Sequence, residues 1–315
     1  MFQITVQKTR MKTAFNWTGN MKALVVTVLT LTMLASVTTG KLKDTDLEDI
    51  SAYRYLRRIG VPLATKLRKA EEEIDKNPYR IVGGEFSYIV YFPYQAGLLI
   101  DTQEGTAICG GSLISQRWVL TAGHCWFDGE TQAWNFKVVL GSTRLYGSDG
   151  LRLDTSNVLT HPSFTPPITN DIAMVMLPRN IGYSSTIAPV ALPSGDETTY
   201  SFEGWYGMAS GYGFTSDDDN VENDRFLSYV YLPVVSRLNC YPFWDIDFSK
   251  NICASGVKGK STCQGDSGGP IVVNNKNRRV LIGVVSFGSI SGCQKGYPAV
   301  FTRVTTYLSW INKLL

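Results

Sequence analysis

Short apolar runs separated by turn residues dominate the chain from residue 81 onward. Such runs occupy residues 112–120, 136–140, 280–287 and 299–304. Runs of this length, bounded by Gly, Pro, Asn and Asp, are typical of antiparallel β-strands. A helical period appears at the C-terminus, at Tyr307, Trp310, Ile311 and Leu314. The pattern therefore predicts an all-β protein that ends in a helix over about residues 304–315.

The start of the chain has a different pattern. Lys22 precedes an apolar stretch at 23–35, and small residues follow up to Gly40. A charged start, a short apolar middle and a small-residue exit are typical of a secretory signal peptide. A membrane anchor is the alternative, but the stretch is shorter than the ~20 residues that a spanning helix needs. We therefore expect a signal peptide over residues 1–40, with internal methionines such as Met21 as alternative starts.

The next segment, 41–80, carries ten Lys/Arg and eight Asp/Glu and no cysteine. Four of its positions have helical spacing: Ile50, Tyr53, Leu56 and Arg57. The mixed charges of residues 70–76 favour a solvated helix. The simplest interpretation is a solvated spacer. A basic residue, Arg80, precedes the sequence Ile81-Val82-Gly83-Gly84, which by itself is a weak signal for proteolytic processing.

Composition narrows the classes of protein. The chain of 315 residues is 44% apolar and 18% charged, which excludes a disordered protein or a coiled coil. The net charge of +3 combines +6 in residues 1–80 with −3 in residues 81–315, so we expect no nucleic-acid partner. All six cysteines lie between Cys109 and Cys293. An even number after a secretory start predicts three disulfides with the pairing open, and free buried thiols are the alternative.

Three polar side chains in distant parts of the chain suggest nucleophilic chemistry. His124, one of only two histidines, ends a β-like run, Asp171 precedes an apolar run, and Ser267 lies among glycines and a proline. Each has a structural explanation by itself, since aspartates often cap turns and glycines permit left-handed backbone angles. Together they match a nucleophile, a base and an orienting acid. A serine needs a base to take its proton, histidines titrate near neutrality, and a carboxylate fixes the imidazole tautomer.

Four motifs follow one another along the chain: Ile81-Val82-Gly83-Gly84, Thr121-Ala122-Gly123-His124-Cys125, Asp171-Ile172-Ala173 and Gly265-Asp266-Ser267-Gly268-Gly269-Pro270. With these motifs the chain resembles the trypsin/chymotrypsin family of serine proteases over residues 81–315. The resemblance implies an all-β fold of two antiparallel six-stranded β-barrels with a C-terminal helix. The first barrel would cover about 81–198 and the second about 199–303. The active site would lie in the cleft between them.

The resemblance also implies a role for each residue of the site. His124 would act as general base and then as general acid, Asp171 would orient it, and Ser267 would attack the peptide carbonyl to form an acyl-enzyme. The backbone N–H groups of Gly265 and Ser267 would form the oxyanion hole. Ser286 matches a position that helps to hold the aspartate.

The same resemblance implies a function for the charged segment 41–80. Residues 41–80 would be an activation propeptide, and cleavage after Arg80 would free the α-amine of Ile81. That amine would fold inward and pair with Asp266, which arranges the oxyanion donors beside it. No cysteine matches the bond that tethers the propeptide in some relatives, so we expect the segment to leave after the cut.

Specificity follows from the residues that match the substrate pocket. By the resemblance, Ser261 would lie at the pocket base, where trypsin-like enzymes carry Asp, so a buried Lys or Arg would lack its counter-charge. Gly288 matches an open pocket wall, and Ala299 would make the base slightly shallower. Ser286, Phe287 and Gly288 would pair with the substrate backbone as an antiparallel strand. We predict a chymotrypsin-like endopeptidase that cleaves after Phe, Tyr or Leu and that needs a separate trypsin-like protease for activation.

The cysteines, a run of aspartates and the second histidine lead to further expectations. The disulfides implied by the resemblance are Cys109–Cys125, Cys240–Cys253 and Cys263–Cys293. We expect no cofactor and no metal, because the run Asp217-Asp218-Asp219 does not match a calcium loop and is interpreted as solvated. The second histidine, His161, matches no functional position and is expected in a surface loop.

The expected protein is a secreted, extracellular monomer without a stable membrane anchor, with a digestive role. Its partners would be protein and peptide substrates, the trypsin-like activating protease and protein protease inhibitors. Two alternatives are a regulatory cascade protease of the same fold with narrow specificity and a non-catalytic homologue that acts as a binding protein. The second is disfavoured because all three triad positions match.

Overall fold

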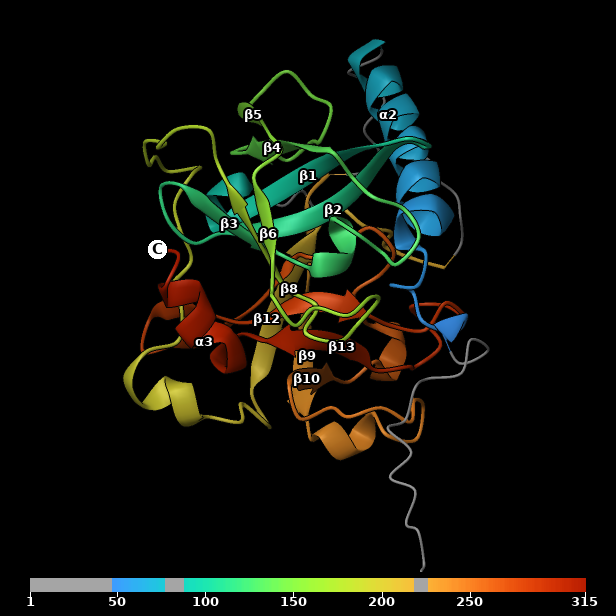
Figure 1. Ribbon diagram of the computed structural model, residues 1–315, viewed down its shortest axis with the longest axis vertical. Helices are drawn as coiled ribbons and strands as arrows, with labels where there is room; N and C mark the ends of the chain where they lie inside the picture. Colours follow the sequence, from blue (N-terminus) through green and yellow to red (C-terminus); the bar gives the residue numbers. More distant parts are fainter. Residues whose placement is uncertain (1–46, 77–87, 218–225) are drawn as a thin grey trace, which may run out of the picture. The chain divides into compact units, whose positions relative to one another are not determined.

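The computed structural model describes three ranges of the chain, 47–76, 88–217 and 226–315 (Figure 1). All of them belong to one compact unit, Gly40–Leu315. The predicted signal peptide and the junction between Arg80 and Ile81 lie outside the described residues. Within the three ranges, no helix is both long and apolar enough to cross a membrane.

The first part of the β structure is an antiparallel sheet. Its strands are β1 (Gln95–Thr102), β2 (Gly105–Leu113), β3 (Trp118–Thr121), β4 (Asn135–Leu140), β5 (Leu151–Thr155), β6 (Val158–Thr160) and β7 (Ala173–Met176). Their order is β5-β4-β1-β2-β3-β7-β6. The two edge strands β5 and β6 are consecutive in the chain, and the N–H of Met176 in β7 donates to the C=O of Asn157 between them (2.9 Å).

This sheet has seven strands where six were expected. The difference arises because one bent strand is divided into β5, which pairs with β4, and β6, which pairs with β7. Residues 156 and 157 lie between the two parts and belong to neither. A single strand thus reaches both edges of the sheet, which is how a barrel avoids unpaired edges.

The second part is a closed barrel of six antiparallel strands. They are β8 (Tyr206–Gly211), β9 (Ser228–Val235), β10 (Asn251–Ala254), β11 (Pro270–Asn275), β12 (Arg278–Phe287) and β13 (Ala299–Arg303), in the order β10-β13-β12-β11-β8-β9. Helix α3 (Val304–Asn312) follows β13. Its buried residues include Tyr307 and Ile311, as the helical spacing predicted. The predicted fold class, all-β with two barrel-like sheets and a C-terminal helix, is confirmed.

Short 3-10 turns connect the strands: η2 (Ile89–Tyr91), η3 (Gly123–Cys125), η4 (Gly195–Thr199), η5 (Arg237–Asn239) and η6 (Val257–Gly259).

Of the predicted strands, 112–120 is wrong as a single run, because β2 ends and β3 begins inside it. The N–H of Ile114 donates to the C=O of Trp118 (3.0 Å), and that of Arg117 donates to Ser115 Oγ (3.3 Å). These hydrogen bonds close a turn between β2 and β3. The apolar pattern continues through the turn, so the sequence alone predicted one continuous strand.

The N-terminal segment is helical. It contains the π-helical turn η1 (Leu56–Gly60), followed directly by the α-helix α2 (Val61–Lys76). In η1, the Val61 N–H donates to the C=O of Leu56, five residues earlier. Pro62 follows at once, and a proline has no N–H and clashes with the carbonyl four residues before it. The wider π turn leaves room for that ring.

One face of this segment is buried in the protein. Five apolar residues share a hydrophobic cluster with β1 and β2: Leu56, Ile59, Leu63, Ala64 and Leu67. Figure 1 shows α2 beside β2. Burial of a Leu or Ile side chain stabilises a structure by about 1.5–3 kcal/mol. The interpretation of this segment as a solvated spacer is therefore wrong for its described residues, because it overlooked the apolar stripe that continues past Leu56.

Candidate active site

The first sheet supplies an aspartate–histidine pair. His124 lies in η3 after β3, and Asp171 lies two residues before β7. Asp171 Oδ2 is 2.8 Å from His124 Nδ1, and Asp171 Oδ1 accepts the His124 backbone N–H (2.8 Å). Both side chains are fully buried. The two carboxylate oxygens therefore hold both the ring and the backbone of the histidine.

The second barrel completes the support of Asp171. Ser286 Oγ in β12 donates to Asp171 Oδ2 (2.6 Å), as expected for a residue that holds the aspartate. Thr302 Oγ1 in β13 donates to the Asp171 backbone C=O (2.7 Å). The sequence analysis did not identify Thr302. The contact joins residues 131 positions apart, and no local pattern marks it.

Ser267 lies in the loop that enters β11, at the junction of the two sheets. Its backbone C=O accepts the N–H of Gly110 in β2 (2.7 Å), and the next residue, Gly268, donates to Val285 in β12 (2.8 Å). A Cβ on Gly110 would come within 2.9 Å of the Gly269 Cα. Glycine is therefore needed where the loop crosses β2. The serine is almost fully buried.

A tyrosine of the N-terminal segment lies between the serine loop and the histidine. The Tyr55 ring is 5.0 Å from the His124 ring in an edge-to-face arrangement, and its hydroxyl donates to the Ile108 C=O (2.8 Å). Burial raises the Tyr55 pKa, and hydrogen bonding by the Ser267 side chain and the Gly265 N–H opposes part of that rise. Among the described residues, His124 Nε2 has no hydrogen-bond partner. The described residues thus hold no Ser267–His124 hydrogen bond.

The Asp266 carboxylate is hydrogen-bonded to the backbone. Its Oδ1 accepts the Gly213 N–H (2.9 Å) and its Oδ2 accepts the Cys263 N–H (2.8 Å). Burial raises the pKa of the Asp266 carboxyl to about 6, although these two hydrogen bonds lower it in part. Asp266 lines a cavity of about 200 Å³ together with Gly211 and Gly213. The carboxylate therefore lies at a partly open pocket that has room for a cationic group.

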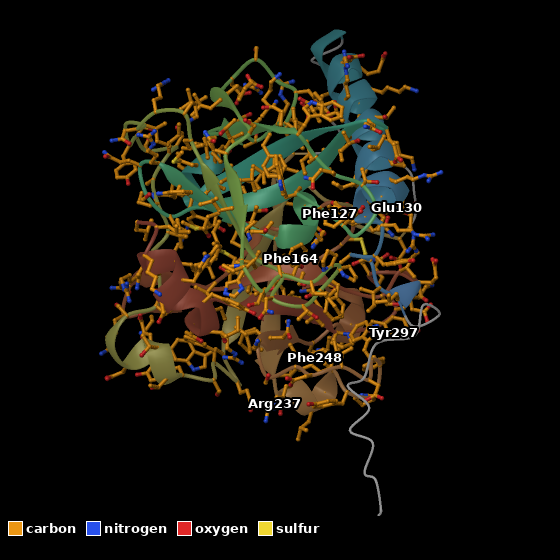
Figure 2. The ribbon with its side chains drawn as sticks, viewed as in Figure 1. Phe127, Glu130, Phe164, Arg237, Phe248 and Tyr297 are labelled. Carbon is orange, nitrogen blue, oxygen red and sulfur yellow. A yellow bond between two sulfur atoms is a disulfide. The ribbon has the colours of Figure 1, made fainter. Side chains whose placement is uncertain are left out.

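The residues assigned to substrate specificity are partly brought together. Ser261, Phe287 and Gly288 line one cavity with Ser267. Tyr297, labelled in Figure 2, lines the same cavity and was not identified from the sequence. Ala299 is buried in the barrel core and does not line this cavity among the described residues.

The structure contains three disulfides, Cys109–Cys125, Cys240–Cys253 and Cys263–Cys293. These are the pairs that the resemblance implied. The first joins β2 to η3 and so fixes the turn that carries His124. The third joins the loop before Ser267 to the loop before β13, and both loops line the cavity of Ser261.

Two residues that were set aside in the sequence analysis have defined contacts. Asp217 accepts the backbone N–H of Cys293 (2.6 Å) and of Gln294 (3.2 Å), so it braces a pocket loop and is not simply solvated, while Asp218 and Asp219 lie outside the described residues. The His161 ring packs 5.1 Å from Tyr307 on α3. Burial, with a smaller effect of Lys250, lowers the His161 pKa.

Comparisons with known proteins agree with this arrangement. The trypsin family model matches residues 81–311. Collagenase from Hypoderma lineatum is 40% identical over 239 residues, covering 74% of this chain and 86% of the relative. Brachyurin from Leptuca pugilator is 38% identical over 235 residues, covering 74% of this chain and 97% of the relative.

A third relative, trypsin 5G1 from Aedes aegypti, is 37% identical over 243 residues, covering 75% of this chain and 85% of the relative. Among solved structures, HL collagenase matches with a TM-score of 0.65 at 38% identity, covering 74% of this chain and 98% of that structure. The family match spans both sheets and the loops that carry His124, Asp171 and Ser267. The chain therefore belongs to the trypsin family of serine endopeptidases.

Proposed function

We propose that the protease domain hydrolyses peptide bonds through an acyl-enzyme formed on Ser267. The observation that carries the proposal is the hydrogen-bonded series from Ser286 through Asp171 to His124, with the Tyr55 side chain in contact with both His124 and Ser267. Asp171 accepts the Nδ1 proton, so the lone pair of Nε2 is available as a base. The non-catalytic alternative is disfavoured, because a binding protein has no need of such a buried, oriented imidazole.

The reaction proceeds in two halves. His124 takes the Ser267 proton as Oγ attacks the substrate carbonyl, and it then gives that proton to the leaving amine as the C–N bond breaks. Water repeats the sequence and releases the acid. The N–H groups of Gly265 and Ser267 stabilise the oxyanion in both halves, and one such donor contributes about 3–4 kcal/mol.

The proposed specificity is for Phe, Tyr or Leu before the scissile bond. The support is the serine at position 261, which lines the cavity beside Ser267 and carries no charge to pair with a buried Lys or Arg. One relative is named a collagenase, so collagen belongs in the test. A panel of fluorogenic peptides with Phe, Tyr, Leu, Arg or Lys at that position, together with native and heat-denatured collagen, measures the preference. Dominant cleavage after Arg or Lys would contradict the assignment.

A substitution at the pocket base is a sharper test of specificity. We expect Ser261→Asp to lower kcat/KM for Phe peptides and to raise it for Arg peptides by about tenfold or more, because a new carboxylate gives a desolvated guanidinium a partner worth a few kcal/mol. Ser261→Asn, which has a similar shape but no charge, is the matched control. An equal gain for Arg peptides in both variants would show that charge does not set the preference.

Activation is proposed to follow the cut after Arg80 by a trypsin-like protease. The new Ile81 ammonium would enter the cavity lined by Asp266 and replace its backbone hydrogen bonds by an ion pair. The support is the position of that carboxylate, at the cavity and one residue from each oxyanion donor. Such a pair works as a switch, since desolvation offsets much of its contribution to stability.

We expect Asp266→Asn to be cleaved at the same bond but to have about 10²–10³-fold lower kcat than the cleaved parent, because the neighbouring oxyanion donors lose their alignment. Without a partner, the buried Asp266 carboxyl has a pKa of about 6. The Ile81 ammonium would lower that pKa, so in the cut parent we expect the ion pair to persist below pH 6 and to weaken only on further acidification. N-terminal sequencing follows the cut, and peptide hydrolysis follows activity. Asp196→Asn, on the exposed turn η4, is the control. Full activity in Asp266→Asn would exclude the switch.

Secretion and a digestive role are also proposed. The support is the signal-peptide pattern and the lack of cysteine in residues 41–80, which argues against a disulfide-knotted recognition module of the kind that regulatory cascades use. Broad cleavage of unrelated proteins by the activated enzyme would favour digestion, and cleavage of a single narrow substrate would favour the cascade alternative.

A further inference from the structure

We propose that residues 47–76 are an inhibitor of the protease domain, bound in its substrate cleft and able to remain there after the chain is cut. The inference rests on the proposed cleavage after Arg80 and adds a second step to it. A spacer would need no specific contact with the site. The described segment instead meets the substrate strand, the serine loop, the histidine and two neighbouring loops.

The first contact is with the strand proposed to bind the substrate backbone. Ile50 forms an antiparallel bridge with Ser289. The Ser51 N–H donates to the Gly288 C=O (3.0 Å), and the Gly288 N–H donates to Ser51 Oγ (3.0 Å). Addition of a strand to an exposed edge is a common mode of peptide recognition. The backbone groups of Gly288 that a substrate would use are therefore already paired.

The second contact is apolar. Ile50 and Ala52 are fully buried and belong to a cluster that includes Ile168, Trp244 and Phe287. Phe287 follows Ser286 on the substrate strand, and its ring packs 5.3 Å from Trp244. The side chains of the segment thus fill the apolar surface beside the cleft, where side chains of a bound substrate would lie.

The third contact is at the reacting atoms. The buried Tyr55 ring packs against His124, and its hydroxyl lies at the Ser267 side chain and the Gly265 N–H. Tyr55 also lines the cavity of Ser261 and Gly288. A phenol group that donates to the Ile108 C=O (2.8 Å) therefore fills the space beside the proposed nucleophile and one proposed oxyanion donor. A phenol has no carbonyl carbon that Ser267 could attack.

The backbone around Tyr55 is not presented as a substrate. Residues 51–54 form turns, and Arg54 has a left-handed backbone with φ of 51°. A substrate must pass the catalytic serine in an extended conformation to pair with the strand on both sides of the scissile bond. The segment therefore pairs with the substrate strand at the isolated bridge of Ile50, turns over residues 51–54 and continues as a helix, a path that blocks the site without presenting an extended scissile bond to Ser267.

Contacts outside the cleft hold the segment in place. The Leu56 N–H donates to Asp128 Oδ2 (2.8 Å), and Arg54 Nε lies 2.9 Å from Glu130 Oε2. Glu130 is labelled in Figure 2 beside this segment. On α2, the Glu71 carboxylate accepts the backbone N–H groups of Leu145 (3.0 Å) and Tyr146 (2.7 Å).

Two features make these anchors strong. Glu71 is almost fully buried, and hydrogen bonds to a charged acceptor are about twice as strong as neutral ones. Leu63 lies so close to the serine loop that a Cβ on Gly265 would be 2.5 Å from its Cδ2. None of these contacts involves the bond after Arg80. All six cysteines lie within residues 109–293, so after the cut no disulfide holds the segment and it can dissociate.

The test uses the secreted proenzyme, its Tyr55→Ala variant and the control Tyr53→Ala. Tyr53 is also in the segment, but its ring packs against Arg54 rather than against the site. Each protein is cut to completion after Arg80, with mass spectrometry to verify that the released segment is intact. Peptide hydrolysis is then measured at micromolar concentration and after hundredfold dilution, and gel filtration shows whether the segment co-elutes with the protease.

We expect the cut parent and Tyr53→Ala to be largely latent at high concentration, with co-eluting segment, and to gain activity per molecule on dilution. Tyr55→Ala should be at least about tenfold more active at high concentration, because a buried aromatic anchor dominates such an interface. If the cut parent is fully active at every dilution and has lost the segment, the inhibitor proposal is wrong while activation stands. If neither the parent nor Tyr55→Ala becomes active on cutting, both proposals fail. Dilution and gel filtration of the parent do not depend on the folding of any variant.

Discussion

Replacement of Ser267 by alanine should lower kcat of the cleaved enzyme by about 10⁶-fold, the largest effect that we expect from one substitution. The change removes the only atom that forms the acyl bond. Residual hydrolysis of about 10³–10⁴-fold above the uncatalysed rate should remain, because the oxyanion donors and the substrate contacts still act on attacking water. Peptide hydrolysis after complete cleavage at Arg80 measures the effect.

The control for this substitution is Ser289→Ala. Ser289 lines the same cavity as Ser267, but among the described residues its Oγ accepts a single loop N–H, that of Ser291 (3.1 Å). We expect its activity to be close to that of the parent. If the Ser267→Ala enzyme hydrolyses peptides at the parental rate, the serine mechanism is excluded, whatever the geometry of the other residues.

The second large effect is expected for Asp171→Asn, at about 10⁴-fold lower kcat. The Asp171 carboxylate accepts hydrogen bonds from His124 Nδ1, from the His124 backbone and from Ser286. An asparagine supplies one acceptor oxygen and one NH₂ donor for these three groups. If the NH₂ faces Nδ1, the imidazole carries its proton on Nε2 and cannot accept the proton of Ser267.

If the NH₂ instead faces the backbone N–H of His124, two donors oppose each other in a fully buried place, which costs about 1–3 kcal/mol and displaces the ring. Either orientation disables the base. Ser286→Ala is the matched control, since it removes one donor but leaves the carboxylate, and we expect a loss of about tenfold or less. Equal losses in Asp171→Asn and Ser286→Ala would mean that the carboxylate serves only to pack the site.

The inhibitory segment changes how these variants should be measured. Tyr55 contacts both the histidine and the serine loop. A rate measured on uncut or incompletely separated protein would therefore depend on release of the segment rather than on the chemical step. Rates should therefore be taken at high dilution. In the same way, the Asp266→Asn result is informative only where gel filtration shows that the segment has left.

Much of the candidate site was predictable from the sequence, because its chemistry resides in short motifs. The residues around His124 and Ser267 identified the family, and the comparisons confirm it. From the family resemblance we predicted the pairing of the six cysteines and the two barrel-like sheets. The helical spacing around Tyr307 predicted α3. These features depend on residues close together in the chain or on motifs whose order is itself informative. The roles of the individual site residues stay predictions until the substitutions above are made.

The contacts that decide how the site works were not predictable in this way. The bond of Thr302 to Asp171 joins the two sheets across 131 positions of the chain. The place of Tyr297 in the pocket and the exclusion of Ala299 from it depend on how the loops around the cavity fold. The N-terminal segment is the clearest case. Its sequence shows charge and helical spacing, which suit a solvated helix as well as a buried one. Only the tertiary structure brings Tyr55 to Ser267, because the groove that receives it is built by two sheets that no stretch of the segment encodes.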